Sequence, residues 1–234
     1  MSTVKEADMD RHDLAYLRDS VTLHFLDVSL PETVKQKVYQ LLSQHIPMTV
    51  CRQEDVDVGQ VKLAINCLLE GYKYRVACLV EKHDIEQITR PLSLQALLKA
   101  DSQLLQPKVL IDFADNLEQL GCKVYVYGSY AYQSLTQEAY VRPTSDLDLL
   151  LYPQHQHDVP EILQFIQQVQ AQSSIRLDGE IQIHPDWHVS FNELIAIFPE
   201  MNQQVIVKGI QRVEMLRLEQ LFEGKLEYAN ATTA

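Results

Sequence analysis

The stretch from Val124 to Gln154, VYVYGSYAYQSLTQEAYVRPTSDLDLLLYPQ, places a Gly-Ser pair at the end of one apolar run and two aspartates at the start of the next. In a strand, side chains two residues apart lie on the same side, roughly 7 Å apart. We therefore expect Asp146 and Asp148 to point the same way, while the leucines between and after them point into a core. Two such carboxylates repel each other unless a cation lies between them, and Mg²⁺ prefers oxygen ligands of this kind.

The Gly128-Ser129 pair supplies the other half of a site. Glycine lets the backbone approach a ligand closely, and a helix that starts there offers free N–H groups and a dipole suited to phosphate. Phosphate beside a carboxylate-bound metal is the arrangement for phosphoryl or nucleotidyl transfer. Each half alone is more often an ordinary turn or the solvated start of a strand, but their order along the chain favours a site.

A third carboxylate would complete that site, and residues 175–183, IRLDGEIQI, provide two candidates. This segment alternates between apolar and polar residues, which predicts a strand with one polar face. Asp178 and Glu180 both lie on that face, and either could be the third carboxylate. Arg142 and Arg176 are candidates for screening phosphate charge, although no motif fixes them.

Composition excludes several classes of function. The 234 residues carry 32 acidic against 20 basic side chains, a net charge of −12, so nucleic acid and anionic membranes are not expected partners. The most apolar long window, residues 61–80, is interrupted by charges such as Lys73 and Arg75, which excludes a membrane span. The N-terminus shows no secretory signal, and the four cysteines form no C-x-x-C pair, so we expect a cytoplasmic protein.

The pattern along the chain predicts an α+β fold in two domains. In residues 1–98, a helix after Pro31 and strands within 48–51, 61–69 and 74–80 form a small α+β domain, with a Glu-Gly turn joining the last two strands. In residues 99–234, strands and helices alternate, which predicts a mixed sheet flanked by helices. Ser93 is a predicted helix cap, and residues 190–193 are a predicted capping box.

Gly128-Ser129 followed by Ser145-Asp146-Leu147-Asp148 resembles the nucleotidyltransferase superfamily with the DNA polymerase β-like fold. That resemblance covers roughly residues 105–215. It implies a Gly-Ser turn, an Asp-x-Asp strand and a carboxylate on a later strand.

A closer resemblance is to the malonate decarboxylase holo-acyl-carrier-protein synthases, the phosphoribosyl-dephospho-CoA transferases. It rests on Arg11-His12-Asp13-Leu14, YGSYAYQSLT, YVRPTSDLDLLL and RLDGEIQIHPDWHVSFNEL, and spans most of the chain. The chain departs from the family pattern at Gln137, where we expect Gly, and this puts the local loop geometry in doubt.

This resemblance implies a reaction, its partners and a set of roles. Such enzymes transfer the phosphoribosyl-dephospho-CoA part of 2′-(5″-triphosphoribosyl)-3′-dephospho-CoA to a serine of an apo acyl carrier protein and release diphosphate. By resemblance, Asp146, Asp148 and Asp178 would hold Mg²⁺, with Glu180 as runner-up for the third position. Gly128 and Ser129 would bind the departing phosphates.

Two other hypotheses remain open at the level of the sequence. The chain could be a nucleotidyltransferase that uses ATP to modify a small molecule or a protein. It could also be a non-catalytic domain that binds a nucleotide or a CoA-like ligand. The presence of both Asp146 and Asp148 counts against the second, because a dead site has no electrostatic reason to keep adjacent carboxylates.

Overall fold

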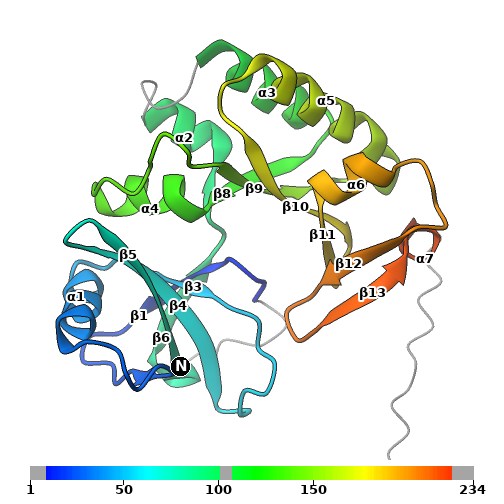
Figure 1. Ribbon diagram of the computed structural model, residues 1–234. Coiled ribbons are helices and arrows are strands. Elements are labelled where there is room, and N and C mark those ends of the chain that lie inside the picture. The colour runs from blue at the N-terminus through cyan, green and yellow to red at the C-terminus, as the bar shows by residue number, and fades with distance from the viewer. Residues whose placement is uncertain (1–8, 101–106, 223–234) are drawn as a thin grey trace, which may run out of the picture.

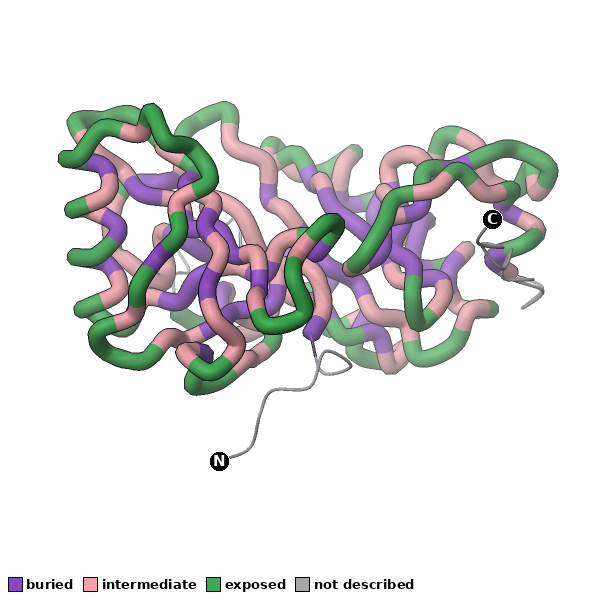
Figure 2. Tube along the Cα trace, turned by 90° about the horizontal axis from the view of Figure 1, so that it is seen from below, coloured by how far each residue is buried: buried purple, intermediate pink, exposed green. Residues whose placement is uncertain are grey.

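The computed structural model describes residues 9–100 and 107–222, which form two sheets with helices packed around them (Figure 1). Each sheet has its own cluster of buried apolar side chains, and buried residues run through the middle of both halves (Figure 2). The expected α+β class is confirmed. None of the described helices is long and apolar enough to cross a bilayer.

The first sheet has six antiparallel strands in the order β2-β5-β4-β3-β1-β6. They are β1 (Leu14–Leu17), β2 (His24–Phe25), β3 (Met48–Val50), β4 (Gln60–Leu69), β5 (Tyr72–Glu81) and β6 (Ile85–Thr89), with the short 3₁₀ helix η2 (Lys82–Asp84) before β6. The helix α1 (Glu32–Ser43) begins after Pro31, as predicted, and buries Val34, Val38 and Leu41 against this sheet.

The hairpin between β4 and β5 turns at Glu70 and Gly71, whose φ angles are 51° and 82°. Positive φ at both central residues matches the twist of the flanking strands. The predicted Glu-Gly turn is therefore confirmed. No pattern along the chain was strong enough to predict the short strands β1, β2 and β6.

The second sheet has seven strands in the order β13-β12-β11-β10-β9-β8-β7. They are β7 (Leu92–Ser93), β8 (Lys123–Tyr127), β9 (Leu147–Tyr152), β10 (Leu177–His184), β11 (Trp187–Ser190), β12 (Gln204–Lys208) and β13 (Val213–Arg217). Among the strands of the described residues, only β9 and β10 pair in parallel, so the sheet is mixed, as expected. The chain turns at Pro185 and Asp186 between β10 and β11, and neither β11 nor β13 was predicted from the sequence.

We call the first sheet with α1 the first domain, and the second sheet with its helices the second domain. Helices other than α4 cover one face of the second sheet and leave the other to the first domain (Figure 1). The helices of the second domain are α2 (Leu94–Ala100), α3 (Pro107–Gln119), α4 (Gly128–Thr136), α5 (Val159–Gln172), α6 (Phe191–Ile197) and α7 (Leu218–Phe222), with the 3₁₀ helix η3 (Gln156–Asp158) before α5. Leu149 and Leu151 pack beneath α3 and α5, as their alternation predicts. The helix α4 lies instead on the side of the first domain, and its Tyr132 belongs to that domain's core.

The predicted helix signals have mixed outcomes. The Ser93 hydroxyl accepts a hydrogen bond from the Ala96 amide at 3.2 Å, which confirms the cap. Ser190 stands at the N-terminus of α6 but makes no side-chain cap bond, and Glu193 accepts a bond from the Ile206 amide at 3.2 Å instead. The capping box was therefore wrong, because pairing with β12 takes up the glutamate. The second sheet starts at Leu92, and the division into domains 1–98 and 99–234 stays a prediction.

Gly179 allows the parallel pair β9–β10 to form. Its φ is 145°, and a Cβ atom there would lie 1.9 Å from the Leu149 carbonyl oxygen. We expect Gly179→Ala to lower the free energy of unfolding by roughly 2–3 kcal/mol or more, because backbone of the neighbouring strand cannot move aside. Denaturant unfolding measures this. Gly59→Ala is the control, since its nearest contact is Glu81 Oε2 at 3.7 Å; equal losses in both variants would contradict the prediction.

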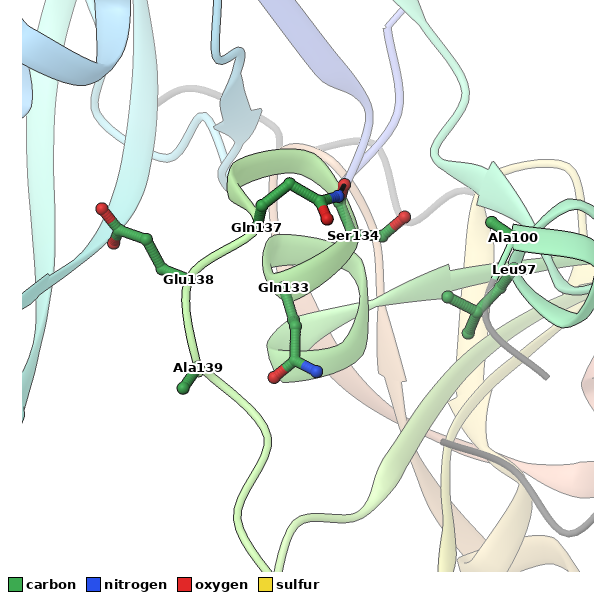
Figure 3. Close-up of a pocket in the computed structure, with 7 residues that line it drawn as sticks. All are labelled: Leu97, Ala100, Gln133, Ser134, Gln137, Glu138 and Ala139. Atoms are coloured by element: carbon green, nitrogen blue, oxygen red, sulfur yellow. Dashed lines mark hydrogen bonds between the residues drawn. The ribbon is translucent and has the colours of Figure 1, made fainter. Parts of the chain in front are cut away.

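Gln137 ends α4 in the left-handed conformation, with φ 59° and ψ 17°, a conformation that favours the Gly we expected there. Its side-chain amide donates to the Ser134 carbonyl at 2.8 Å; both residues are drawn in Figure 3. We expect Gln137→Gly to stabilise the protein by about 0.5–1 kcal/mol, because relief of left-handed strain exceeds the loss of one exposed hydrogen bond. In contrast, Gln167→Gly, on the exposed side of α5, should cost about 1 kcal/mol. Thermal denaturation of both variants tests the difference in sign.

Candidate functional site

Three neighbouring strands place one side chain each in a row on the face of the second sheet that is turned to the first domain. Asp148 of β9 is paired in register with Tyr127 at the end of β8 and with Asp178 of β10. Directly paired residues point to the same face, so the phenol and the two carboxylates lie side by side. Asp146 precedes β9 by one residue and belongs to the same cluster, because its charge acts on Asp148.

The Gly-Ser turn comes directly against this row. Gly128 has a φ of 68°, and a Cβ atom on it would lie 1.9 Å from Asp148 Oδ2. The helix α4 begins at Gly128, and no side chain caps its N-terminus. Free N–H groups and a carboxylate therefore meet at one point, which is the arrangement that the sequence predicted for phosphate beside a metal-binding aspartate.

Asp148 has an unusual protonation equilibrium. Burial raises its pKa, and the charges of Asp178 and Asp146 raise it further, from 3.8 to about 7. The opposing effects of Lys73 and Arg176 are smaller. The carboxylate is thus held where its own charge is disfavoured, a condition that a bound cation would relieve.

The two other aspartates have partners within the chain. Asp146 forms a bidentate ion pair with Arg176, whose Nε lies 2.6 Å from Oδ1. Asp178 Oδ1 accepts hydrogen bonds from the Gly179 amide at 2.8 Å and from Asn192 Nδ2 at 3.0 Å. The Arg176 side chain is 75% exposed, so it can leave Asp146 without breaking any packing.

The donor set suits Mg²⁺ chemically, since it consists of carboxylate oxygens with unbalanced negative charge. Among residues 9–100 and 107–222, in the side-chain positions of this structure, no three His, Cys, Asp or Glu side chains converge closely enough to hold a metal ion. Two of the three carboxylates are engaged within the chain, Asp146 by Arg176 and Asp178 by the Gly179 amide and Asn192.

Glu180, the other candidate for the third carboxylate, has a different environment. It is buried, with Lys208 Nζ at 2.9 Å and Arg11 Nη2 at 3.0 Å from its Oε1. Burial raises its pKa, but Arg11, His12 and Lys208 outweigh that effect and lower the pKa to about 2. Its charge is already balanced, so the geometry favours Asp178, which is paired directly with Asp148.

The remaining predicted donor-binding residue, Arg142, lies at the edge of the site. Its Nη2 donates to the Gly71 carbonyl at 2.9 Å, which ties it to the β4–β5 turn. The structure therefore brings together Gly128, Ser129 and the three aspartates with Arg176, and places Arg142 at the rim.

Residues of the first domain complete the surroundings, and sequence reasoning missed their roles. The His12 ring lies 4.2 Å from the Tyr127 ring, and burial lowers its pKa to about 4, so the imidazole is neutral near pH 7. Lys73 Nζ donates to Ser129 Oγ at 3.0 Å. The only signal for His12 was the compact Arg11-His12-Asp13 triplet, and Lys73 stood out only as a charge within an apolar window.

A pocket of about 230 Å³ opens between the two domains beside Gly128 and Asp148. Its walls include His12, Arg75 and Tyr127, and apolar residues of α4. A second pocket, of about 260 Å³, lies between α2 and α4 (Figure 3). Its one charged lining residue, Glu138, is paired with Lys37 at 2.5 Å, so this pocket offers no group for chemistry.

The raised pKa of Asp148 predicts a pH-dependent effect on stability. The folded protein holds the proton more tightly than the unfolded chain, so the carboxylate destabilises the fold increasingly as pH rises from about 4 to about 7. In buffer with a chelator, we expect Asp148→Asn to raise the free energy of unfolding by on the order of 2 kcal/mol at about pH 8 and by much less at about pH 4. Asp115→Asn, on the exposed side of α3, is the control. A gain for Asp148→Asn that is independent of pH would contradict the prediction.

Comparison with known proteins agrees with this site. The family model described as "Phosphoribosyl-dephospho-CoA transferase MdcG C-terminal domain" matches residues 92–219, which hold the aspartate row and the Gly-Ser turn. A phosphoribosyl-dephospho-CoA transferase of Xanthomonas axonopodis pv. citri is 27% identical over 216 residues, covering 92% of this chain and 97% of its own. One from Bradyrhizobium diazoefficiens is 31% identical over 156 residues, 65% of each chain.

No solved structure matches the chain. The family match covers more than half of the chain, and the Xanthomonas relative extends it across both domains. The resemblance stated from the sequence is thereby confirmed. The chain belongs to the MdcG family of phosphoribosyl-dephospho-CoA transferases.

Proposed function

We propose that this transferase loads the prosthetic group of malonate decarboxylase. The donor is 2′-(5″-triphosphoribosyl)-3′-dephospho-CoA, and the acceptor is a serine of the apo acyl carrier protein subunit. Family membership supports this assignment. The observation that carries it is the approach of Gly128, at the free N-terminus of α4, to the half-buried carboxylate of Asp148.

The reaction is a displacement at the α-phosphorus of the donor triphosphate. The serine oxygen bonds to that phosphorus, the bond to the β-phosphate breaks, and diphosphate leaves with the electron pair. The serine proton must pass to a base, and the product is a phosphodiester. Catalysis of this kind depends mainly on positioning the groups and on stabilising charge.

The residues of the site divide these tasks. The N–H groups at the start of α4 and the Ser129 hydroxyl hold the departing phosphates. Asp178 uses Oδ1 to accept bonds from Gly179 and Asn192, so Oδ2 is the atom that would receive the serine proton. The neutral His12 ring, packed on Tyr127, excludes water from the other side of the row.

Mg²⁺ is the cofactor that this donor set would hold, through Asp146, Asp148 and Asp178. Bound there, it would offset the charge of the triphosphate and stabilise the leaving diphosphate. Arg176 would exchange Asp146 for donor phosphate, since a guanidinium pairs equally well with either anion.

An intact-mass assay tests the assignment. Apo carrier protein is incubated with the chain and either the triphosphoribosyl-dephospho-CoA donor or ATP. We expect the carrier to gain the mass of phosphoribosyl-dephospho-CoA with the first donor and no mass with ATP. An adenylyl adduct with ATP would replace the proposal with the general nucleotidyltransferase hypothesis, and no adduct with either donor would favour a binding role.

The same assay separates the roles of Asp178 and Glu180. We expect Asp178→Asn to lower the transfer rate at least about 100-fold with little change in thermal midpoint, because it removes a metal ligand and proton acceptor. Glu180→Gln should destabilise the protein by roughly 3 kcal/mol, because Arg11 and Lys208 lose their buried partner, while transfer by the folded fraction persists. Full activity in Asp178→Asn together with lost activity in folded Glu180→Gln would reverse the assignment.

A further inference from the structure

The β4–β5 hairpin of the first domain carries cations to the Gly-Ser turn of the second. In the register of this hairpin, Lys73 is paired with Leu68 and Arg75 with Asn66. Side chains two apart in a strand share a face, so Lys73 and Arg75 point the same way. That face is directed at α4, because Lys73 Nζ donates to Ser129 Oγ at 3.0 Å.

Lys73 also sets the direction of the Ser129 hydroxyl. Since Ser129 Oγ accepts the hydrogen bond from Lys73, its own hydrogen is free to be donated elsewhere. An anion in front of the α4 N-terminus would accept a hydrogen bond from this hydroxyl, and it would also accept bonds from the N–H groups of the first turn. An ammonium, a hydroxyl and backbone amides thus converge on one anion-binding position.

Arg75 lines the wall of the interdomain pocket that Gly128 and Asp148 also line. Among the residues that the structure describes, its guanidinium forms no ion pair or side-chain hydrogen bond. Arg75 and Asp148 are the two charged lining residues of this pocket, and the Arg75 guanidinium has five N–H donors.

A third cation adds to this group at the hairpin turn. Arg142 Nη2 donates a hydrogen bond to the Gly71 carbonyl. Burial lowers the pKa of Lys73, the nearby charge of Arg142 lowers it further, and the charge of Asp148 raises it. Three cations therefore gather beside the aspartate row of a chain whose net charge is −12. Such a concentration of positive charge, held partly unpaired, suits a polyanion such as diphosphate.

We propose that Lys73 and Arg75 of the first domain bind the two phosphates that leave as diphosphate, and so complete the donor site of the second domain. This inference rests on the proposed function. As the bond between the α- and β-phosphates breaks, negative charge grows on the departing diphosphate. Lys73 and Arg75 stand where that charge develops, so they stabilise the leaving group as well as the bound donor.

The test is titration calorimetry of the full-length chain with inorganic diphosphate in the presence of Mg²⁺, alongside the carrier mass assay. We expect Lys73→Met and Arg75→Met each to weaken diphosphate binding about 10-fold or more and to lower kcat/KM for the donor by a similar factor. Lys73→Arg should recover much of the binding, because it keeps the charge. Lys99→Met is the matched control: Lys99 is an exposed lysine of α2 that does not line the pocket, and its loss should change neither quantity.

Lys73→Met and Arg75→Met should keep the thermal midpoint of the wild-type chain, since the side chains of Lys73 and Arg75 are exposed. Unchanged diphosphate affinity in both, or no diphosphate binding by the wild-type chain, would overturn the inference even if the carrier is loaded normally. Conversely, diphosphate binding that depends on Lys73 and Arg75 in a chain that loads no carrier would support this phosphate site and reject the proposed function.

Discussion

The repulsion among Asp146, Asp148 and Asp178 is the constraint on which the site depends. Each carboxylate is partly withdrawn from water, and each meets a different compensation. Arg176 neutralises Asp146, and Asn192 with a backbone amide holds Asp178. Asp148 has no such partner among the described residues, and burial together with the charges of Asp178 and Asp146 raises its pKa to about 7. The negative charge at Asp148 is therefore not fully balanced by the chain itself, and the register of β8, β9 and β10 determines where this charge lies.

Two glycines make this concentration of carboxylates possible. Gly128 lets the start of α4 come against the Asp148 carboxylate, and Gly179 lets β10 lie close to β9 beside Asp178. A side chain at either position would occupy the space of the neighbouring strand or of the carboxylate itself. The backbone is therefore as much a part of the site as the acids are, since it brings amide groups within reach of the ligand.

Contacts between the domains hold the hairpin cations over this row. Tyr132 and Tyr140 pack into the core of the first domain, and the Tyr140 hydroxyl donates to the Asn66 carbonyl of β4 at 3.0 Å. On the other side of the row, Arg11 reaches Glu180 across the interface. Buried charge pairs add little net stability but impose strict geometry. The contact at Asn66 lies beside the hairpin cations, because Asn66 is paired in register with Arg75.

The sequence was sufficient for features encoded locally, and insufficient for those that arise from pairing between distant segments. Alternation and spacing predicted Asp146 and Asp148 on one face, the Gly-Ser helix start and the polar face of β10. They could not choose between Asp178 and Glu180, because only the parallel register shows which one is paired with Asp148. Lys73 and Arg75 carried no motif, and their meaning comes from a hairpin that packs against a helix over fifty residues further along the chain.

The net charge of −12 sets a further condition on how such a site can work. A donor with a triphosphate is repelled by the chain at long range, but in physiological salt that field decays over about 8 Å. Inside this distance, the few cations at Ser129 and in the pocket determine the potential, and their effect is larger where water is excluded. Selectivity for a phosphorylated donor therefore has to come from short-range contacts supplied jointly by both domains. Under the proposed function, a chain that kept the aspartates but lost the hairpin cations would retain the phosphates more weakly, because only the N–H groups of α4, Ser129 and Arg176 would remain to bind them.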